Sequence, residues 1–91
     1  PDTRRSFKVT LGIMPDVSGD DIKGVKADAV IEGRPAAKAG MKKGDIIVAL
    51  DGKPVNDIYE YMNRLQQFKA GQRITIEVIR NNEKIILIAE L

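Results

Sequence analysis

The chain has 91 residues, of which 43% are hydrophobic and 31% charged, and a domain of this size buries only about 60 to 65% of its unfolded surface around one modest core. Its 15 basic and 13 acidic residues are interleaved and give a net charge of +2, so no basic stripe is present for nucleic acid, and no apolar run approaches the ~20 residues that span a bilayer. Cysteine and histidine are both absent, which removes disulfides, the common zinc ligands and the usual general base for a serine nucleophile; we expect no metal and no other cofactor.

Residues 1–6 are polar and are predicted to be a linker remnant, with one domain over residues 7–91. Because the chain opens with Pro1 and not with Met, we expect an excised fragment of a larger protein. Apolar residues alternate with polar or small ones from Phe7 to Ile13, which predicts a strand with one buried face. Gly12 interrupts this strand. It is either an incidental glycine, or a residue whose wide choice of backbone angles lets successive N–H groups converge on an anion.

The next segment, residues 15–21, is turn-rich and acidic and is predicted to be a loop. Its aspartates, Asp16, Asp20 and Asp21, raise the alternative of a calcium site, but the EF-hand spacing with its central glycine and closing glutamate is absent. We therefore favour a solvated acidic loop. Residues 24–31 again alternate and predict a strand that places Val25, Ala27, Ala29 and Ile31 on its inner face.

A compact unit follows between Glu32 and Gly52. Pro35 suits the first turn of a helix, where its missing N–H leaves no bond unmade, and Gly40 suits the left-handed position that ends one. Residues 35–39 are therefore predicted to be a short helix. Residues 46–50 form a near-continuous apolar run, which predicts a strand covered on both faces, and Asp51-Gly52 predicts a tight turn after it.

The order RPAAKAGMKKGDIIVALDGKPV, residues 34–55, resembles the core signature of bacterial PDZ domains, the kind appended to HtrA-type serine proteases, tail-specific proteases and some secreted zinc aminopeptidases. The resemblance implies an α+β fold, a PDZ-like partly open barrel or sandwich of about five to six strands with one short and one longer helix in the bacterial strand order. In that family this segment supports the binding groove and does not form it.

The resemblance also gives Gly12 a role. Residues 10–13, Thr-Leu-Gly-Ile, are similar to the x-φ-Gly-φ carboxylate-binding loop of PDZ domains, where φ is apolar. This implies that Leu11, Gly12 and Ile13 bind the terminal carboxylate of a peptide. Because a loop glycine carries no core packing, Gly12→Ala is expected to weaken carboxylate binding and to leave most of the stability in place.

The main helix is predicted to begin at Asp57, with Glu60 reaching back to the N–H of the cap, and to end at Gly71. An apolar stripe recurs at helical spacing along it. In PDZ domains this helix forms one wall of the peptide groove; alternatively, the whole stripe is core, which we favour for Leu65 and Phe68. The groove residues implied are Thr10, Met14, Ile58, Tyr61, Met62 and Leu65, of which Ile58, Tyr61 and Met62 are the stronger candidates on the helix. A final hairpin is predicted over residues 73–91, turning at Asn81-Asn82.

No catalytic residues are predicted. The only serines, Ser6 and Ser18, have no histidine to activate them, so the domain itself is not expected to be an enzyme. Two functions remain. The domain either captures C-terminal or extended peptide segments of protein substrates by strand addition, or it is a docking module whose groove is filled by its own host protein. The resemblance implies a secreted or periplasmic peptidase as host, and hence a periplasmic or extracellular location.

Pro15 bears on the choice between these functions. Alternate residues of an edge strand present their N–H to the same side, so if the N–H of Ile13 faces a ligand, the next donor belongs to residue 15. That residue is proline and has no N–H. We therefore expect the groove to hold only the last residue or two of a peptide, or to serve docking.

Overall fold

The computed structural model describes residues 11–16 and 23–91 of the chain. The predicted linker, Thr10 and the acidic loop residues 17–22 lie outside these ranges, as do Ser6 and Ser18. The elements are β1 (Ile13–Pro15), β2 (Val25–Val30), α1 (Pro35–Ala39), β3 (Ile46–Leu50), β4 (Lys53–Pro54), α2 (Ile58–Gln66), β5 (Arg73–Arg80) and β6 (Glu83–Glu90).

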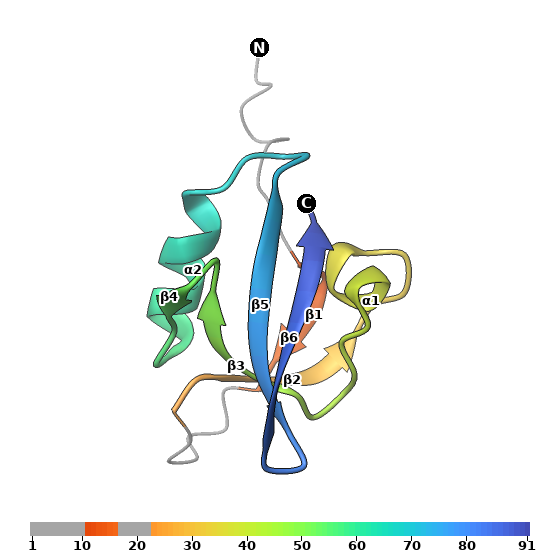
Figure 1. Cartoon of the computed structure of the whole chain (residues 1–91), viewed down its shortest axis with the longest axis vertical. Coiled ribbons are helices and arrows are strands. Elements are labelled where there is room, and N and C mark those ends of the chain that lie inside the picture. Colours follow the sequence, from red (N-terminus) through yellow and green to blue (C-terminus); the bar gives the residue numbers. More distant parts are fainter. Residues whose placement is uncertain (1–10, 17–22) are drawn as a thin grey trace.

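The strands form a six-stranded antiparallel open sheet in the order β1-β2-β3-β5-β6, with β4 paired to β3. Figure 1 shows α2 beside the short strand β4 at one side of the molecule, where Arg64 Nε donates a hydrogen bond to the carbonyl of Pro54 at 3.2 Å. Helix α1 packs against β6 at the other side. The predicted α+β class, with one short and one longer helix, is confirmed.

The predicted ends of the short helix and the two predicted tight turns are confirmed, because each depends only on residues close together in the sequence. Pro35 begins α1, and Gly40 ends it at φ 99°, where its N–H donates to the carbonyls of Ala36 and Ala37. Asp51 and Gly52, at φ 53° and 81°, make the turn after β3. The final hairpin turns, as predicted, at Asn81 and Asn82 with φ 53° and 65°.

The face pattern predicted for β2 is wrong in its second half. Val25 and Ala27 are buried, but Ile31 is 47% exposed, and Val30 packs against the core in its place. The cause is a register shift: Met14 pairs with Ala29 while Pro15 pairs with Ala27. One extra residue on β2 forms a bulge, and a bulge exchanges the two faces of the strand beyond it.

Helix α2 begins as predicted and ends early. The N–H of Glu60 donates to Asp57 Oδ1 at 2.9 Å, and Glu60 Oε1 accepts from the N–H of Asn56 at 2.8 Å, one residue before the cap. The helix stops at Gln66 and not before Gly71. Residues 67–72 form a turn between α2 and β5. Two hydrogen bonds within this turn hold it: the side chain of Gln72 accepts from the N–H of Lys69, and the N–H of Gln72 donates to the carbonyl of Lys69.

The core lies between the sheet and the two helices and contains residues from almost every element. Leu11, Ile47, Leu50 and Ile76 are fully buried, and α2 contributes two residues. Phe68 is buried as predicted, although it lies beyond the helix. The buried cluster is Leu11, Val25, Ala27, Ala36, Met41, Ile47, Leu50, Val55, Tyr61, Leu65, Phe68, Ile74, Ile76, Val78 and Ala89.

Candidate functional site

The candidate site is the loop of residues 11–13, which leads into β1. The carbonyl of Leu11 accepts from the N–H of Ala36 at 2.9 Å, and the carbonyl of Gly12 accepts from the N–H of Ile31 at 2.8 Å. Both carbonyls therefore point toward residues 31–36. In a trans peptide unit the N–H points opposite to the C=O, so the N–H groups of Gly12 and Ile13 both point away from that segment. Two consecutive donors are thus directed to one side.

Gly12 holds this arrangement through its backbone angles. Its φ is +80°, in the left-handed region that L-residues adopt only at a cost. In a regular strand consecutive carbonyls alternate in direction, so a residue outside the strand conformation is needed to turn both to the same side. Its N–H has no acceptor among residues 11–16 and 23–91. The glycine is therefore a conformational requirement and not an incidental strand residue.

The sheet leaves the same side open at β1. Ile13 pairs with Val30, and the bond from Ile31 N–H to the Gly12 carbonyl flanks that pair, which makes it a non-hydrogen-bonded pair whose Ile13 N–H points away from β2. The hydrogen bond from Asp16 N–H to the Lys26 carbonyl flanks the pair of Pro15 with Ala27 in the same way, so this is also a non-hydrogen-bonded pair. Residue 15 therefore faces the open side and offers no donor, as the sequence predicts.

Two side chains of the loop pack against the hydrophobic core. Leu11 is fully buried in the core, and Ile13 is half-buried against it. Met14 is 57% exposed and carries accessible apolar surface at the edge. The buried side chain of Leu11 therefore holds the start of the loop against the core.

The residues of α2 divide into two groups. Tyr61 and Leu65 are 6% and 8% exposed and belong to the core, and burial raises the pKa of the Tyr61 hydroxyl. Met62 is 52% exposed, and Ile58 is half-buried. Among the groove residues implied on the helix, Met62 and Ile58 therefore present the accessible surface, whereas Tyr61 and Leu65 offer a ligand little.

Sequence reasoning missed the role of Arg34. This residue precedes α1, and a Cβ added to Gly12 would lie 2.1 Å from Arg34 Cβ and 2.5 Å from Cγ. The aliphatic part of Arg34 therefore lies directly on Gly12. Their separation of 22 positions gives no periodic signal, and only the folded chain brings the two together.

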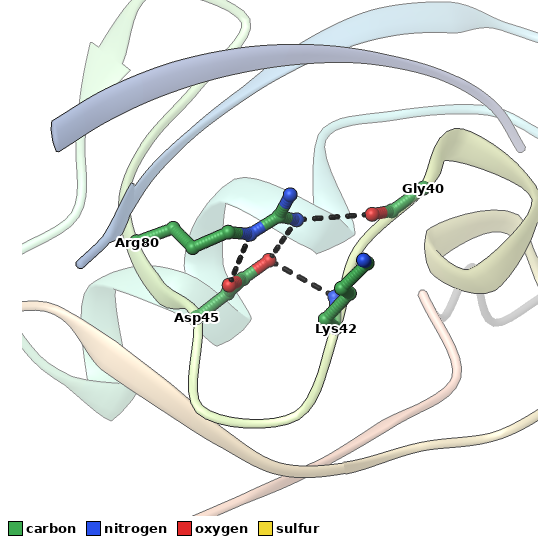
Figure 2. Close-up of polar contacts among 4 residues, drawn as sticks. All are labelled: Gly40, Lys42, Asp45 and Arg80. Atoms are coloured by element: carbon green, nitrogen blue, oxygen red, sulfur yellow. Dashed lines mark hydrogen bonds and ion pairs between the residues drawn. The ribbon is translucent and has the colours of Figure 1, made fainter.

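A second missed feature is a buried ion pair that fixes the turn before β3 (Figure 2). Asp45 is 1% exposed and accepts from Arg80 Nε at 2.8 Å, from Arg80 Nη2 at 2.6 Å and from the N–H of Lys42 at 2.9 Å. Arg80 Nη2 also donates to the carbonyl of Gly40 at 3.0 Å. This pair joins the end of α1, the start of β3 and the end of β5.

The charges of this pair are mutually stabilised. Burial alone would raise the pKa of the Asp45 carboxyl, but the hydrogen bonds from Arg80 and Lys42 outweigh it and the pKa is lowered. The hydrogen bond to Asp45 in turn raises the pKa of Arg80. Both carboxylate oxygens of Asp45 are engaged by Arg80, and Arg80 also binds the carbonyl of Gly40, so we assign the pair a structural role.

Within residues 11–16 and 23–91, no three or more acidic residues gather in a way that fits a metal ion; Asp20 and Asp21 of the predicted acidic loop lie outside this part. In the same part of the chain, no helix is long and apolar enough to cross a membrane.

Comparison with known proteins decides the family. The sequence profile of the PDZ domain matches residues 9–90, nearly the whole chain. This chain belongs to the PDZ domain family. The predicted resemblance is thereby confirmed.

The PDZ domain has relatives among bacterial proteases. It is 39% identical over 69 residues to the periplasmic pH-dependent serine endoprotease DegQ of Escherichia coli, covering 76% of this chain and 15% of that protein. It is 30% identical over 90 residues to the periplasmic serine endoprotease DegP of the same organism, covering 89% of this chain and 19% of DegP. The chain thus spans less than a fifth of the length of either relative.

Solved structures agree with this placement. The HtrA-type protease AlgW with a decapeptide superposes with a TM-score of 0.82 at 28% identity, covering 92% of this chain and 29% of that one. An aminopeptidase N family protein from Idiomarina loihiensis reaches a TM-score of 0.81 at 23% identity, with 92% and 14% coverage. The second likeness shows the fold alone. A PDZ domain of the HtrA type is consistent with either a peptide-binding or a docking module.

Proposed function

We propose that this PDZ domain captures the C-terminal segment of a protein by strand addition at β1, with the carboxylate held by the N–H groups of Gly12 and Ile13. The observation that carries the proposal is the direction of these two N–H groups, which point together to the open side of an edge strand. A carboxylate accepts several such donors at once, and charge-assisted bonds are the stronger kind. The HtrA-type protease AlgW, which contains a domain of this fold, was solved with a decapeptide, and this is consistent with a peptide as the ligand.

The terminal side chain of the ligand is proposed to dominate recognition. Pro15 has no N–H, so one backbone hydrogen bond between β1 and an extended ligand is missing. Its loss removes about 0.5 to 1.5 kcal/mol of net binding free energy. A large apolar side chain of the ligand, buried against the half-buried Ile58 and the exposed Met62 of α2, gains about 25 cal/mol per Å², or roughly 2 to 3 kcal/mol. We expect tails ending in Leu, Val, Ile or Phe to bind at tens of micromolar or more weakly, on the scale where 1 μM is about −8 kcal/mol.

The host is proposed to be a periplasmic serine protease of the HtrA type. DegQ and DegP, at 39% and 30% identity, are periplasmic serine endoproteases, whereas the likeness to an aminopeptidase is one of fold only. The captured tail would then belong to a substrate or to an unfolded protein. The coding sequence that adjoins this domain tests the host class, because a Ser-His-Asp protease domain supports it and a metal-binding peptidase domain contradicts it.

An NMR titration tests capture. The probe is an acetylated pentapeptide without charged side chains that ends in Val-Leu, used with a free carboxylate and, as the matched control, with a C-terminal amide. Capture predicts shifts at the amides of Leu11, Gly12 and Ile13 and at the methyl of Met62 that disappear with the amidated peptide. If no tail produces shifts, the groove is not a peptide site, and docking to the host protein becomes the better reading.

A further inference from the structure

Strand β6 leaves one edge of the sheet open. It is the last strand in the order β1-β2-β3-β5-β6, and within residues 11–16 and 23–91 only β5 pairs with it. The strand runs for eight residues from Glu83 to Glu90, contains no proline, and keeps its register with β5 without a bulge. Proteins commonly protect an exposed edge with a proline, a bulge or a short strand, and β6 has none of these features.

The hairpin geometry decides which residues of β6 offer backbone hydrogen bonds at this edge. Arg80 and Glu83 flank the two-residue turn, and such a flanking pair exchanges both of its hydrogen bonds. Bonded and non-bonded pairs then alternate along the hairpin, and the bond from Leu91 N–H to the Gln72 carbonyl fits this alternation at the far end. The odd-numbered residues of β6 therefore face β5. The residues whose N–H and C=O groups point to the open edge are Lys84, Ile86, Ile88 and Glu90.

The side chains of these four residues form the outer face of the strand. Ile86 and Ile88 are 59% and 61% exposed. The inner face is covered instead: Leu87 packs against the core, and a Cβ on Gly40, at the end of α1, would lie 4.0 Å from Leu87 Cδ2. Exposed apolar side chains beside unpaired backbone groups are typical of a surface that contacts another protein chain.

The edge of β6 is complementary to a second copy of itself. Two β6 strands can pair antiparallel about a two-fold axis only where even-numbered residues face each other, because only these offer backbone groups. With the axis at Leu87, Lys84 lies opposite Glu90 of the second copy. Ile86 then lies opposite Ile88, and the axis repeats each contact. A shift of the axis by one residue in either direction places a charged residue opposite an isoleucine.

The charges on the outer face support this register. In each chain Lys84 Nζ lies 3.3 Å from Glu77 Oε1, and Arg73 Nη2 lies 4.0 Å from Glu90 Oε1. Pairing about Leu87 makes these two exposed ion pairs neighbours across the interface. The charges then alternate in one row, in the order Glu77, Lys84, and Glu90 and Arg73 of the second copy. Such a network stabilises more than its separate exposed pairs do.

We propose that the domain self-associates through β6, which pairs antiparallel with β6 of a second copy about a two-fold axis at Leu87. The pairing joins the two sheets into one and covers Ile86 and Ile88 of both copies. It uses the end of the strand order opposite to β1 and does not rest on the proposed peptide site. A single pair of strands is smaller than a standard protein interface, so we expect a dissociation constant on the order of 0.1 mM.

Charge reversal tests the register. Lys84→Glu alone, or Glu90→Lys alone, sets like charges against each other twice in the dimer, whereas the double variant restores opposite charges. Within one chain the two positions lie roughly 20 Å apart along the strand, so they do not contact each other. A non-additive effect on the dissociation constant therefore reports a contact between copies. Both side chains are exposed, so the variants are expected to fold.

The dissociation constant is measured by diluting the ¹⁵N-labelled chain from about 1 mM to about 20 μM and following its amide shifts, with the mass checked by sedimentation velocity. Each single reversal should weaken association by about 5- to 30-fold, and the double variant should return to within about 3-fold of the wild type. Ile88→Lys should weaken association by about 10-fold or more. Tyr59→Lys adds the same charge to an exposed site on α2 and is the matched control, which should associate as the wild type does.

Dilution shifts at the amides of Ile86 and Ile88, together with the mass of a dimer, support the proposal. A chain that stays monomeric at about 1 mM overturns it. Dilution shifts confined to β1 and α2 also overturn it, because the copies then meet elsewhere. Additive losses in the double charge reversal overturn the register about Leu87 and with it the proposal. None of these results decides the peptide titration, so the proposed function stands or fails separately.

Discussion

Replacing Gly12 by alanine tests the loop geometry most directly, because the domain contains a matched control. Gly12 and Gly52 have nearly identical φ angles of +80° and +81°, so an alanine at either position costs about 1 to 2 kcal/mol in backbone energy. Around Gly52 no heavy atom lies within 4 Å of an added Cβ, whereas at Gly12 the Arg34 Cβ lies at 2.1 Å. The two substitutions therefore differ in one contact.

The size of the difference follows from that contact. Carbon atoms pack at about 3.5 to 4.0 Å, so Arg34 must move by more than an ångström, and forcing extra volume into a packed site costs about 1 to 3 kcal/mol. We expect Gly52→Ala to lower the free energy of unfolding by about 1 to 2 kcal/mol and Gly12→Ala by about 2 to 5 kcal/mol. The sequence-based expectation that Gly12→Ala leaves most of the stability in place assumed that Gly12 packs against nothing. The structure contradicts this assumption, because Arg34 packs directly against Gly12.

Equilibrium unfolding in urea measures both values, and a second background isolates the contact. Arg34→Gly removes the stem while keeping a residue that is tolerated before a helix. In that background Gly12→Ala should cost no more than Gly52→Ala. If Gly12→Ala is equally destabilising with and without the arginine, or no worse than Gly52→Ala in the wild type, the arrangement of Gly12 and Arg34 described above is incorrect.

Three further predictions concern other parts of the domain. Asp45→Asn should lower the free energy of unfolding at pH 7 by roughly 2 to 3 kcal/mol, since it removes buried charge-assisted bonds to Arg80. Because the folded pKa of Asp45 is lowered, its stabilisation is fully present above the unfolded pKa of about 4 and is lost as the pH falls through the folded pKa. The unfolding free energies of wild type and variant should therefore converge in acid, and a gap that stays constant as the pH falls would argue against the pair. Pro15→Ala restores a donor on the open side of β1 and should tighten binding of the free pentapeptide by about 2- to 10-fold in the NMR titration; unchanged affinity would place the ligand elsewhere. The isolated domain should show only background hydrolysis of peptide, ester and glycoside substrates, and turnover abolished by Ser18→Ala would overturn that expectation.

The sequence by itself determined the elements whose signals are local. Pro35 and Gly40 bound α1 because their backbone preferences act within one turn, and Asp51-Gly52 turns after β3 because both residues tolerate positive φ. The donor missing at Pro15 also follows from the residue type alone, once β1 is known to be an edge strand. The family resemblance then predicted how these elements are arranged, and a domain profile over residues 9–90 confirms the family.

Only the tertiary structure decided the features that depend on residues distant in sequence. The bulge on β2 is set by pairing with β1, and it moves Val30 into the core in place of Ile31. Asp45 finds Arg80 across 35 positions, and Arg34 lies on Gly12 across 22. Periodicity and turn propensity describe neighbours along the chain, whereas register, ion pairing and the side chain that covers a glycine are fixed by which strands and loops pack together.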